Sequence, residues 1–282
     1  HSHLIHADLW CALLKKIYRL KIPIVSTKHG YDEEYISKHG FSADHLVKNR
    51  YYKICKFSEK SIHRSFAVSE GLRKLFIDAG ICQSRNISTI HHGFDLPDVE
   101  HKENPDFRFS PHQIVVLGRI IPFKGHMHLF KALPIIKEQI GDIKLLVLGH
   151  GDQYLIDELQ SFSEEKGISD SVEFMGYQSN IYDYLVNSDV MVVPSIAEGF
   201  GLIFLEALNS KLPIVGFDVP ATNEIIVDRE TGTLIPPYDH ELLAQAIISL
   251  LNEPSKQDEF AEKGYQRLKS HFSLDRMVTE TI

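Results

Sequence analysis

The sequence has few cysteines, and they follow no known pattern. Cys11, Cys55 and Cys82 are the only three among 282 residues, and none belongs to a Cys-x-x-Cys pair. This spacing excludes a disulfide framework and a cysteine-rich zinc site, and it favours a reducing, cytoplasmic setting. Long apolar runs are also missing. None approaches the ~20 residues that a helix needs to span a bilayer.

Two nucleotide-binding signatures are incomplete or absent. Gly149-His150-Gly151 begins a Gly-x-Gly-x-x-Gly fingerprint, but Tyr154 stands where the third glycine belongs. A nicotinamide-dependent dehydrogenase is therefore weakly supported. No Asp-x-Asp triplet, which would hold a metal beside a diphosphate, is present.

Three histidines near the start invite a metal interpretation. His1, His3 and His6 lack the i, i+4 spacing that places two zinc ligands on one helix face, and no carboxylate motif accompanies them. We therefore assign no metal ligand.

The charge is unevenly distributed. Residues 1–98 hold 15 Lys and Arg against 10 Asp and Glu, whereas the remainder holds 15 against 28. The basic half could make peripheral contact with an anionic membrane or an anionic acceptor. The alternative is an ordinary solvated helix surface. No nucleic-acid-reading motif accompanies the charge, so nucleic acid is not an expected partner.

From residue 114 onward, apolar runs of strand length alternate with segments of helical periodicity. Near-continuous apolar strands between helices are typical of a parallel sheet covered on both faces. The sequence therefore predicts an α/β fold with a Rossmann-like domain over residues 113–270. The expected strands are 114–117, 143–148, 172–175, 190–193, 212–216 and 233–235.

Residues 1–98 repeat this pattern less completely, as the later part of a second α/β domain. A proline-containing linker is expected over 99–112, and a tail or helix over 271–282. The expected elements of the first part are helices over 8–20 and 43–64 and strands over 22–27, 66–69 and 87–90.

The most informative motif runs from Glu198 to Glu206. Gly199, Phe200 and Gly201 precede a predicted helix, where backbone N–H groups can close on an anion. Glu206 lies among apolar residues of that helix, where an ionised side chain is costly to bury without a partner. Two carboxylates around an anion-binding helix start predict a site for a phosphate joined to hydroxyl-bearing sugars. The alternative is an ordinary strand–helix turn with a solvated glutamate.

Suitable side chains also follow the other strands. Ligands of open α/β sheets bind beyond the carboxyl ends of the strands. An arginine and a lysine around one turn can converge on a diphosphate, glycines allow close backbone approach, and a base can stack near a tyrosine. These residues are Gly118, Arg119, Lys124, Gly149, Gly151 and Tyr177.

In combination the motifs resemble those of a known family. The order GR-x4-KG, GxG, MGY, PS-x2-EGFGLIFLEAL and P-x2-NEII resembles the nucleotide-sugar domain of retaining glycosyltransferases of GT-B architecture. This is glycosyltransferase family 4, group 1, of which the Glu-x7-Glu spacing is the hallmark. HSHLIHADLW, TKHGYDEEY and FAVSEGLRKLF…IHHGFD resemble the latter half of its acceptor domain. The resemblance implies a GT-B fold of two Rossmann-like domains, the N-terminal one incomplete.

The resemblance implies four catalytic residues. Arg119 and Lys124 would bind the donor diphosphate and stabilise charge on the departing nucleotide. Glu198 would hydrogen-bond the hydroxyls of the transferred sugar. His29 is similar to the acceptor-domain histidine near the reacting sugar, where it could donate to a hydroxyl or carry a proton; the alternative is a satisfied structural histidine.

The resemblance also implies the donor-binding set. Glu206 would accept hydrogen bonds from the ribose diol, and backbone N–H groups of Phe200 and Gly201 would approach the phosphate or sugar. His91 and His92 are expected to support the strand end and linker, in a loop that can border the cleft. The full donor-binding set is Gly118, Arg119, Lys124, Gly149, Gly151, Tyr177, Glu198, Gly199, Phe200, Gly201 and Glu206.

The family's first strand and its glycine-rich loop have no counterpart here, so the resemblance implies an N-terminally truncated fragment that keeps the donor site. The implied function is a retaining, metal-independent transfer of a hexose from a nucleoside diphosphate sugar, UDP more than GDP. No cofactor is expected. The acceptor would be a saccharide or lipid-linked, in glycan or cell-surface polysaccharide biosynthesis at the cytoplasmic face of a membrane. The alternatives are a non-catalytic nucleotide-sugar-binding fragment and a GT-B epimerase or phosphorylase.

Overall fold

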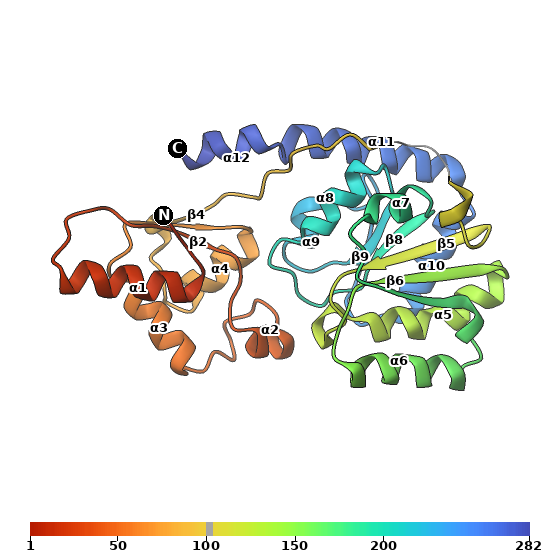
Figure 1. The fold of residues 1–282 in the computed structure, drawn as a ribbon, viewed down its shortest axis with the longest axis horizontal. Helices are drawn as coiled ribbons and strands as arrows, with labels where there is room; N and C mark the ends of the chain where they lie inside the picture. The colour runs from red at the N-terminus through yellow and green to blue at the C-terminus, as the bar shows by residue number, and fades with distance from the viewer. Residues whose placement is uncertain (100–103) are drawn as a thin grey trace.

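The computed structural model describes residues 1–99 and 104–282. It contains two separate parallel sheets, which occupy the two ends of the molecule (Figure 1). Residues 100–103, part of the predicted linker 99–112, lie outside the described residues. The predicted α/β fold is confirmed, whereas the predicted domain boundaries stay a prediction.

The larger sheet has six parallel strands in the order β10-β9-β8-β5-β6-β7. Alternate residues of its central strands pack into different clusters: Val115 faces one helical layer, and Ile114 and Val116 face the other. The strands are apolar along their length because both faces are covered. They are β5 (His112–Leu117), β6 (Ile143–Leu148), β7 (Val172–Gly176), β8 (Val190–Val193), β9 (Ile214–Phe217) and β10 (Thr233–Ile235).

Helices cover the two faces of this sheet. One layer holds buried side chains of α7 and α8, the other holds those of α5, α6 and α10, and α11 contributes to both. The bounds are α5 (His126–Ile140), α6 (Gln153–Glu165), α7 (Ile181–Val186), α8 (Leu202–Asn209), α9 (Thr222–Ile225), α10 (His240–Leu251) and α11 (Pro254–His271).

The smaller sheet has four parallel strands in the order β1-β2-β3-β4. A buried ion triad joins it to its helices, because the Nζ atom of Lys28 lies 2.6 Å from carboxylate oxygens of both Asp8 and Glu59. The elements are β1 (Ser2–His3), α1 (Leu4–Ile17), β2 (Val25–Lys28), α2 (Glu33–His39), α3 (Arg50–Glu59), β3 (Arg64–Ala67), α4 (Glu70–Asp78) and β4 (Ile87–Thr89).

Two predicted helices of this part have different bounds. The long helix expected over 43–64 is the shorter α3, because the Asn49 side chain accepts a hydrogen bond from Tyr52 N (2.9 Å) and caps a helix that begins at Arg50. The helix expected over 8–20 begins at Leu4 and ends at Ile17. Helix α2, which we did not predict, is capped by Asp32.

The end of the chain returns to the smaller sheet. Helix α12 (Leu274–Thr281) follows α11 directly, and Phe94 pairs with Ser273 in an isolated parallel bridge. The bridge is closed by hydrogen bonds from Phe94 N to Phe272 O (2.8 Å) and from Leu274 N to Phe94 O (3.2 Å). Figure 1 shows α11 and α12 running from one half of the molecule to the other. The predicted tail is therefore a docked helix.

Candidate functional site

A cavity of about 360 Å³ opens where β5, β6 and β7 end. Two loops form its floor, and they meet so closely that a Cβ atom on Gly149 would lie 1.8 Å from the carbonyl oxygen of Gly118. Gly149 also has φ +147°, which side chains rarely adopt. Because these glycines carry no side chain, a ligand can approach the backbone of the cavity floor closely. Five of the predicted donor-binding residues line this cavity: Gly118, Arg119, Gly149, Tyr177 and Glu206.

Glu206 lies on α8 and lines this cavity. Its side chain is half-buried, and burial raises its pKa. Within residues 1–99 and 104–282, no group donates a hydrogen bond to its carboxylate. Burial, and then the Glu206 carboxylate, also raises the pKa of Tyr182 to about 12. Hydrogen bonds donated by a ligand would stabilise the ionised form of a carboxylate in this setting.

Lys124 and Glu198 form a buried ion pair. Lys124 Nζ lies 2.5 Å from Glu198 Oε1, and the two side chains are 16% and 5% exposed. The same oxygen accepts a hydrogen bond from Ser195 Oγ at 2.9 Å. The lysine ends η3 (Pro122–Lys124), and a Cβ on the following Gly125 would lie 1.9 Å from Pro194 O. The loops after β5 and β8 therefore pack directly and bring these two predicted residues together.

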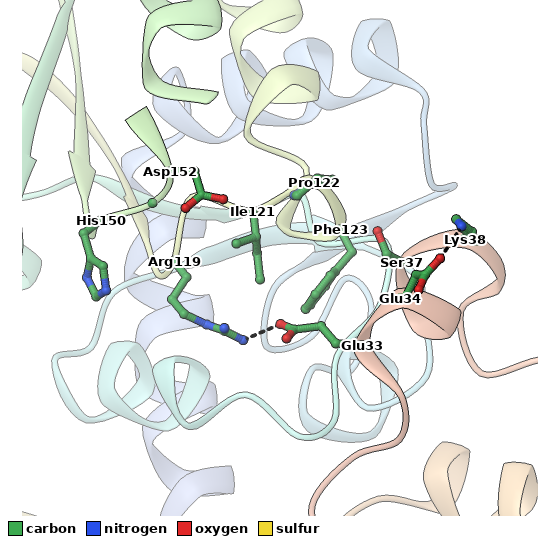
Figure 2. A pocket seen from close by; sticks show the side chains of 11 residues that line it. Glu33, Glu34, Ser37, Lys38, Arg119, Ile121, Pro122, Phe123, His150 and Asp152 are labelled. Carbon is green, nitrogen blue, oxygen red and sulfur yellow. Dashed lines mark hydrogen bonds and ion pairs between the residues drawn. The ribbon is translucent and has the colours of Figure 1, made fainter. Parts of the chain in front are cut away.

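Arg119 is engaged by a different carboxylate. Its Nη2 atom lies 2.9 Å from Glu33 Oε1 on α2, across a cavity of about 570 Å³ (Figure 2). Both side chains are more than half exposed, at 56% and 59%. Arg119 also borders the first cavity, so the two cavities adjoin. Arg119 and Lys124, which we expected to share one diphosphate, each hold a carboxylate in this structure.

The loop over residues 198–201 touches the smaller half of the molecule. A Cβ on Gly199 would lie 2.6 Å from His29 O. The Phe200 ring is 3% exposed and lies 5.6 Å from the ring of His91 and 5.3 Å from that of His92. Gly201, with φ +84°, precedes α8. The sequence placed this loop at a ligand, whereas the structure shows that it also joins the two halves.

His29 belongs to a stack of histidines. Its Nε2 atom lies 2.9 Å from His3 Nδ1, and its ring centre lies 5.2 Å from that of His92. Burial, followed by the charges of His92 and His3, lowers the pKa of His29 to about 4. His29 is therefore neutral near pH 7 and can exchange hydrogen bonds without carrying a charge.

Some predicted residues stand apart from these contacts. Tyr177 is exposed at the rim of the first cavity, where its ring meets His150. Gly151 lies on the wall of the second cavity, where a Cβ would meet Ile120 O at 2.2 Å.

Sequence reasoning assigned no role to two acidic residues. Glu33 reaches Arg119 from α2, and the Glu224 carboxylate accepts hydrogen bonds from Glu70 N, Gly71 N and His91 Nε2. The Asn-Glu-Ile-Ile segment was a signal for Glu224, but three of its four hydrogen-bond donors are more than 130 positions away. For Glu33 no local signal existed.

In the part of the chain that the structure describes, no group of three or more His, Cys, Asp or Glu side chains is placed to hold a metal ion. His1 bonds Thr27 Oγ1 instead, at 2.8 Å. No helix among the described residues combines the length and apolar character needed to cross a membrane.

Comparisons with known proteins identify the family of the chain. The family model described as "Glycosyl transferases group 1" matches residues 99–267, and "Glycosyltransferase Family 4" matches residues 1–97. The chain is similar to a phosphatidyl-myo-inositol mannosyltransferase of Mycobacterium leprae, 30% identical over 56% of this chain and 42% of the relative. It is also similar to a poly(glycerol-phosphate) alpha-glucosyltransferase of Bacillus subtilis, 26% identical over 62% of this chain and 30% of the relative.

A solved structure shows the same fold. The Anabaena protein Alr3699/HepE, crystallised with UDP and glucose, superposes with a TM-score of 0.82 over 99% of this chain and 75% of its own, at 20% identity. The architecture is therefore GT-B, as the motifs implied. The chain spans less than half the length of the two curated relatives named above. On the extent of the family match, the chain belongs to the glycosyl transferases of group 1, the family with the Glu-x7-Glu motif.

Proposed function

We propose that this chain carries the donor side of a retaining glycosyltransferase that moves a hexose from a nucleoside diphosphate sugar. The observation that supports it most is the placement of the two glutamates. Glu206 lines the cavity beyond β5, β6 and β7 without a protein partner, while Glu198 lies beside Lys124 at the contact between the two halves. Glu206 would bind the ribose and Glu198 the transferred sugar. Retention follows from the family alone.

The two cations would change partners when the donor binds. A diphosphate competes with Glu33 for Arg119 and with Glu198 for Lys124, and the Arg119 pair is the easier to break because it is exposed. Once engaged, both cations stabilise negative charge on the departing nucleotide. Glu198, released from Lys124, is then free to accept hydrogen bonds from sugar hydroxyls.

His29 would act as a neutral hydrogen-bonding group. The low pKa of His29 keeps its ring uncharged. The backbone carbonyl of His29 contacts Gly199, so the residue lies beside the loop 198–201. A neutral imidazole can donate to a sugar hydroxyl without repelling Lys124.

UDP is the donor nucleotide we favour over GDP. The Anabaena structure of the same fold contains UDP and glucose. The acceptor would be a saccharide or lipid-linked glycan, in glycan or cell-surface polysaccharide biosynthesis. The cysteine pattern supports a cytoplasmic site of action.

Peripheral contact with an anionic membrane is supported by the surface of α1. Trp10 and Ile17 of α1 and the residue that caps its C-terminus, Tyr18, are all more than 60% exposed, beside Lys15 and Lys16. Exposed apolar and basic residues on one helix are typical of interfacial binding. Co-sedimentation with vesicles containing phosphatidylserine, against neutral vesicles, tests this contact.

A donor screen tests the proposed function. Ligands that bind the folded state raise the unfolding temperature by mass action, so UDP-, GDP- and ADP-sugars are compared by thermal shift. We expect UDP-sugars to give the largest shift and Glu206→Ala to abolish it.

Donor turnover is then measured with and without saccharide acceptors. Binding without any turnover would identify a non-catalytic nucleotide-sugar-binding fragment, and no binding to any donor would refute the proposal.

A further inference from the structure

Glu224 accepts hydrogen bonds from three different elements. Its carboxylate lies 2.7 Å from Glu70 N and 2.9 Å from Gly71 N, both in the first turn of α4. His91 Nε2, beyond β4, lies 2.8 Å away, and Ala221 N of its own loop 3.2 Å away. Three of these four donors belong to the other half of the molecule. Glu224 therefore makes a concentrated polar contact between the halves.

The position of Glu224 at the N-terminus of α4 stabilises its negative charge. The first N–H groups of a helix have no partner within the helix, and the helix dipole attracts a negative charge to that end. Burial alone would raise the pKa of Glu224, but the hydrogen bonds from His91, Glu70 N and Gly71 N lower it overall. A Cβ on Gly71 would lie 2.3 Å from Pro220 Cβ, so α4 lies directly on the loop that carries Glu224.

His91 also contacts the loop 198–201, which carries Glu198. The ring of His91 stacks on that of Phe200, with centres 5.6 Å apart and planes 28° apart. On its other sides Phe200 meets His92 and Phe272, and it is almost completely buried. The hydrogen bond to Glu224 fixes the His91 ring in its plane, and the stacked ring limits where Phe200 can lie. A continuous series of contacts thus joins Glu224 to the loop 198–201.

We propose that His91, oriented by Glu224, is a positioning residue that holds the loop 198–201 in the shape that presents Glu198 to the donor sugar. The inference rests on the proposed function and adds residues that contact no donor atom. Because Glu224 and His91 come from different halves, the shape of the loop depends on the contact between them. The cavity at Glu206 is lined by residues of the larger half and does not include the loop 198–201, so we expect nucleotide binding to depend on the shape of this loop less than turnover does.

Three variants separate this role from general stability. Glu224→Gln keeps the size of the side chain and removes its charge. His91→Phe keeps the stacked ring and removes the hydrogen bond. Glu70→Gln is the matched control, because that side chain bonds only Arg73 and Thr89 of its own half among the described residues. Thermal unfolding of each variant shows which are folded.

The first readout is amide hydrogen exchange of peptides covering residues 196–205, measured on the full chain without ligand. We expect faster exchange in Glu224→Gln and His91→Phe and no change in Glu70→Gln. The second readout separates kcat from nucleotide affinity. We expect kcat for donor consumption to fall at least tenfold in both variants, since a displaced reacting group costs about that much or more, while the Kd for UDP stays within twofold. The double variant should lose no more than the larger single loss.

Two results would overturn the inference. One is unchanged exchange and unchanged kcat in folded Glu224→Gln and His91→Phe. The other is an equal loss of UDP affinity and kcat, which would place these residues in the nucleotide site. A parent chain that binds and consumes no nucleotide sugar would refute the proposed function instead, and the exchange data would still decide whether Glu224 and His91 order the loop.

Discussion

The two sheets have different kinds of interior. Central strands of the larger sheet bury side chains such as Val115, Leu146 and Val192 completely, and its stability comes from apolar area removed from water. The smaller sheet buries Lys28 between Asp8 and Glu59. Taking charges out of water costs free energy that the ion pairs only partly return. We therefore expect the smaller half to be the more sensitive to loss of charge and the larger half to loss of close packing.

Removing the buried lysine should have the largest effect. Lys28→Met leaves two buried carboxylates without a cation, which should lower the free energy of unfolding by about 3–5 kcal/mol. Urea unfolding followed through Trp10, the chain's single tryptophan, reports on this half. In the control Lys38→Met, an exposed pair with Glu34 is lost, and the change should stay below about 0.5 kcal/mol. Equal, small changes in both variants would show that the triad contributes little.

The matching test in the larger half is Gly149→Ala. The added methyl group would overlap Gly118 O and force an unfavourable φ, so we expect a loss of about 2–4 kcal/mol from overpacking and strain. Nucleotide binding should also be lost, because the cavity floor moves. Gly141→Ala, with φ +84° but nothing within 4 Å of the new Cβ, isolates the strain and should cost about 1–2 kcal/mol. Similar losses in the two variants would refute the close contact as the cause.

Glu206→Gln should have opposite effects on binding and on stability. UDP affinity should fall by about tenfold or more in calorimetry, since a charge-assisted hydrogen bond is lost. Because burial raises the pKa of Glu206, its ionised form is disfavoured in the folded protein. The variant should therefore be more stable than the parent at neutral pH, and this gain should vanish as the pH falls below the ordinary glutamate pKa of 4.5. Unaltered UDP affinity would remove Glu206 from the ribose site.

The smallest expected effect concerns the exposed pair across the second cavity. Glu33→Gln removes the carboxylate that competes with a diphosphate for Arg119, so UDP should bind more tightly, by at most about fivefold, as exposed pairs are worth ~0.2–1 kcal/mol. Glu34→Gln is the neighbouring control, because Glu34 pairs with Lys38 on its own helix. An equal gain in both variants would indicate a general electrostatic effect of α2 instead of competition at Arg119.

Much of the larger half could be predicted from sequence. All six of its strands lie within about two residues of the expected runs, because their apolar character is a local consequence of burial on both faces. The smaller half was harder to predict. The helical periodicity predicted one long helix over 43–64, but the side-chain cap at Asn49 makes the helix begin only at Arg50. Helix α2 is too short to show a helical periodicity in the sequence. The assigned roles of His29, Arg119, Lys124, Glu198 and Glu206 stay predictions until they are tested.

By itself, the sequence determined what depends on neighbouring residues. It set the alternation of strands and helices, and the glycines before α8. It also set the spacing that places Glu206 in α8, eight positions after Glu198 in the preceding loop. The tertiary structure decided which charges meet. Lys124 and Glu198, Arg119 and Glu33, and Glu70 N and Glu224 are 74, 86 and 154 positions apart. Such pairs form only because sheet order brings distant strand-end loops together and the returning α12 joins the two halves.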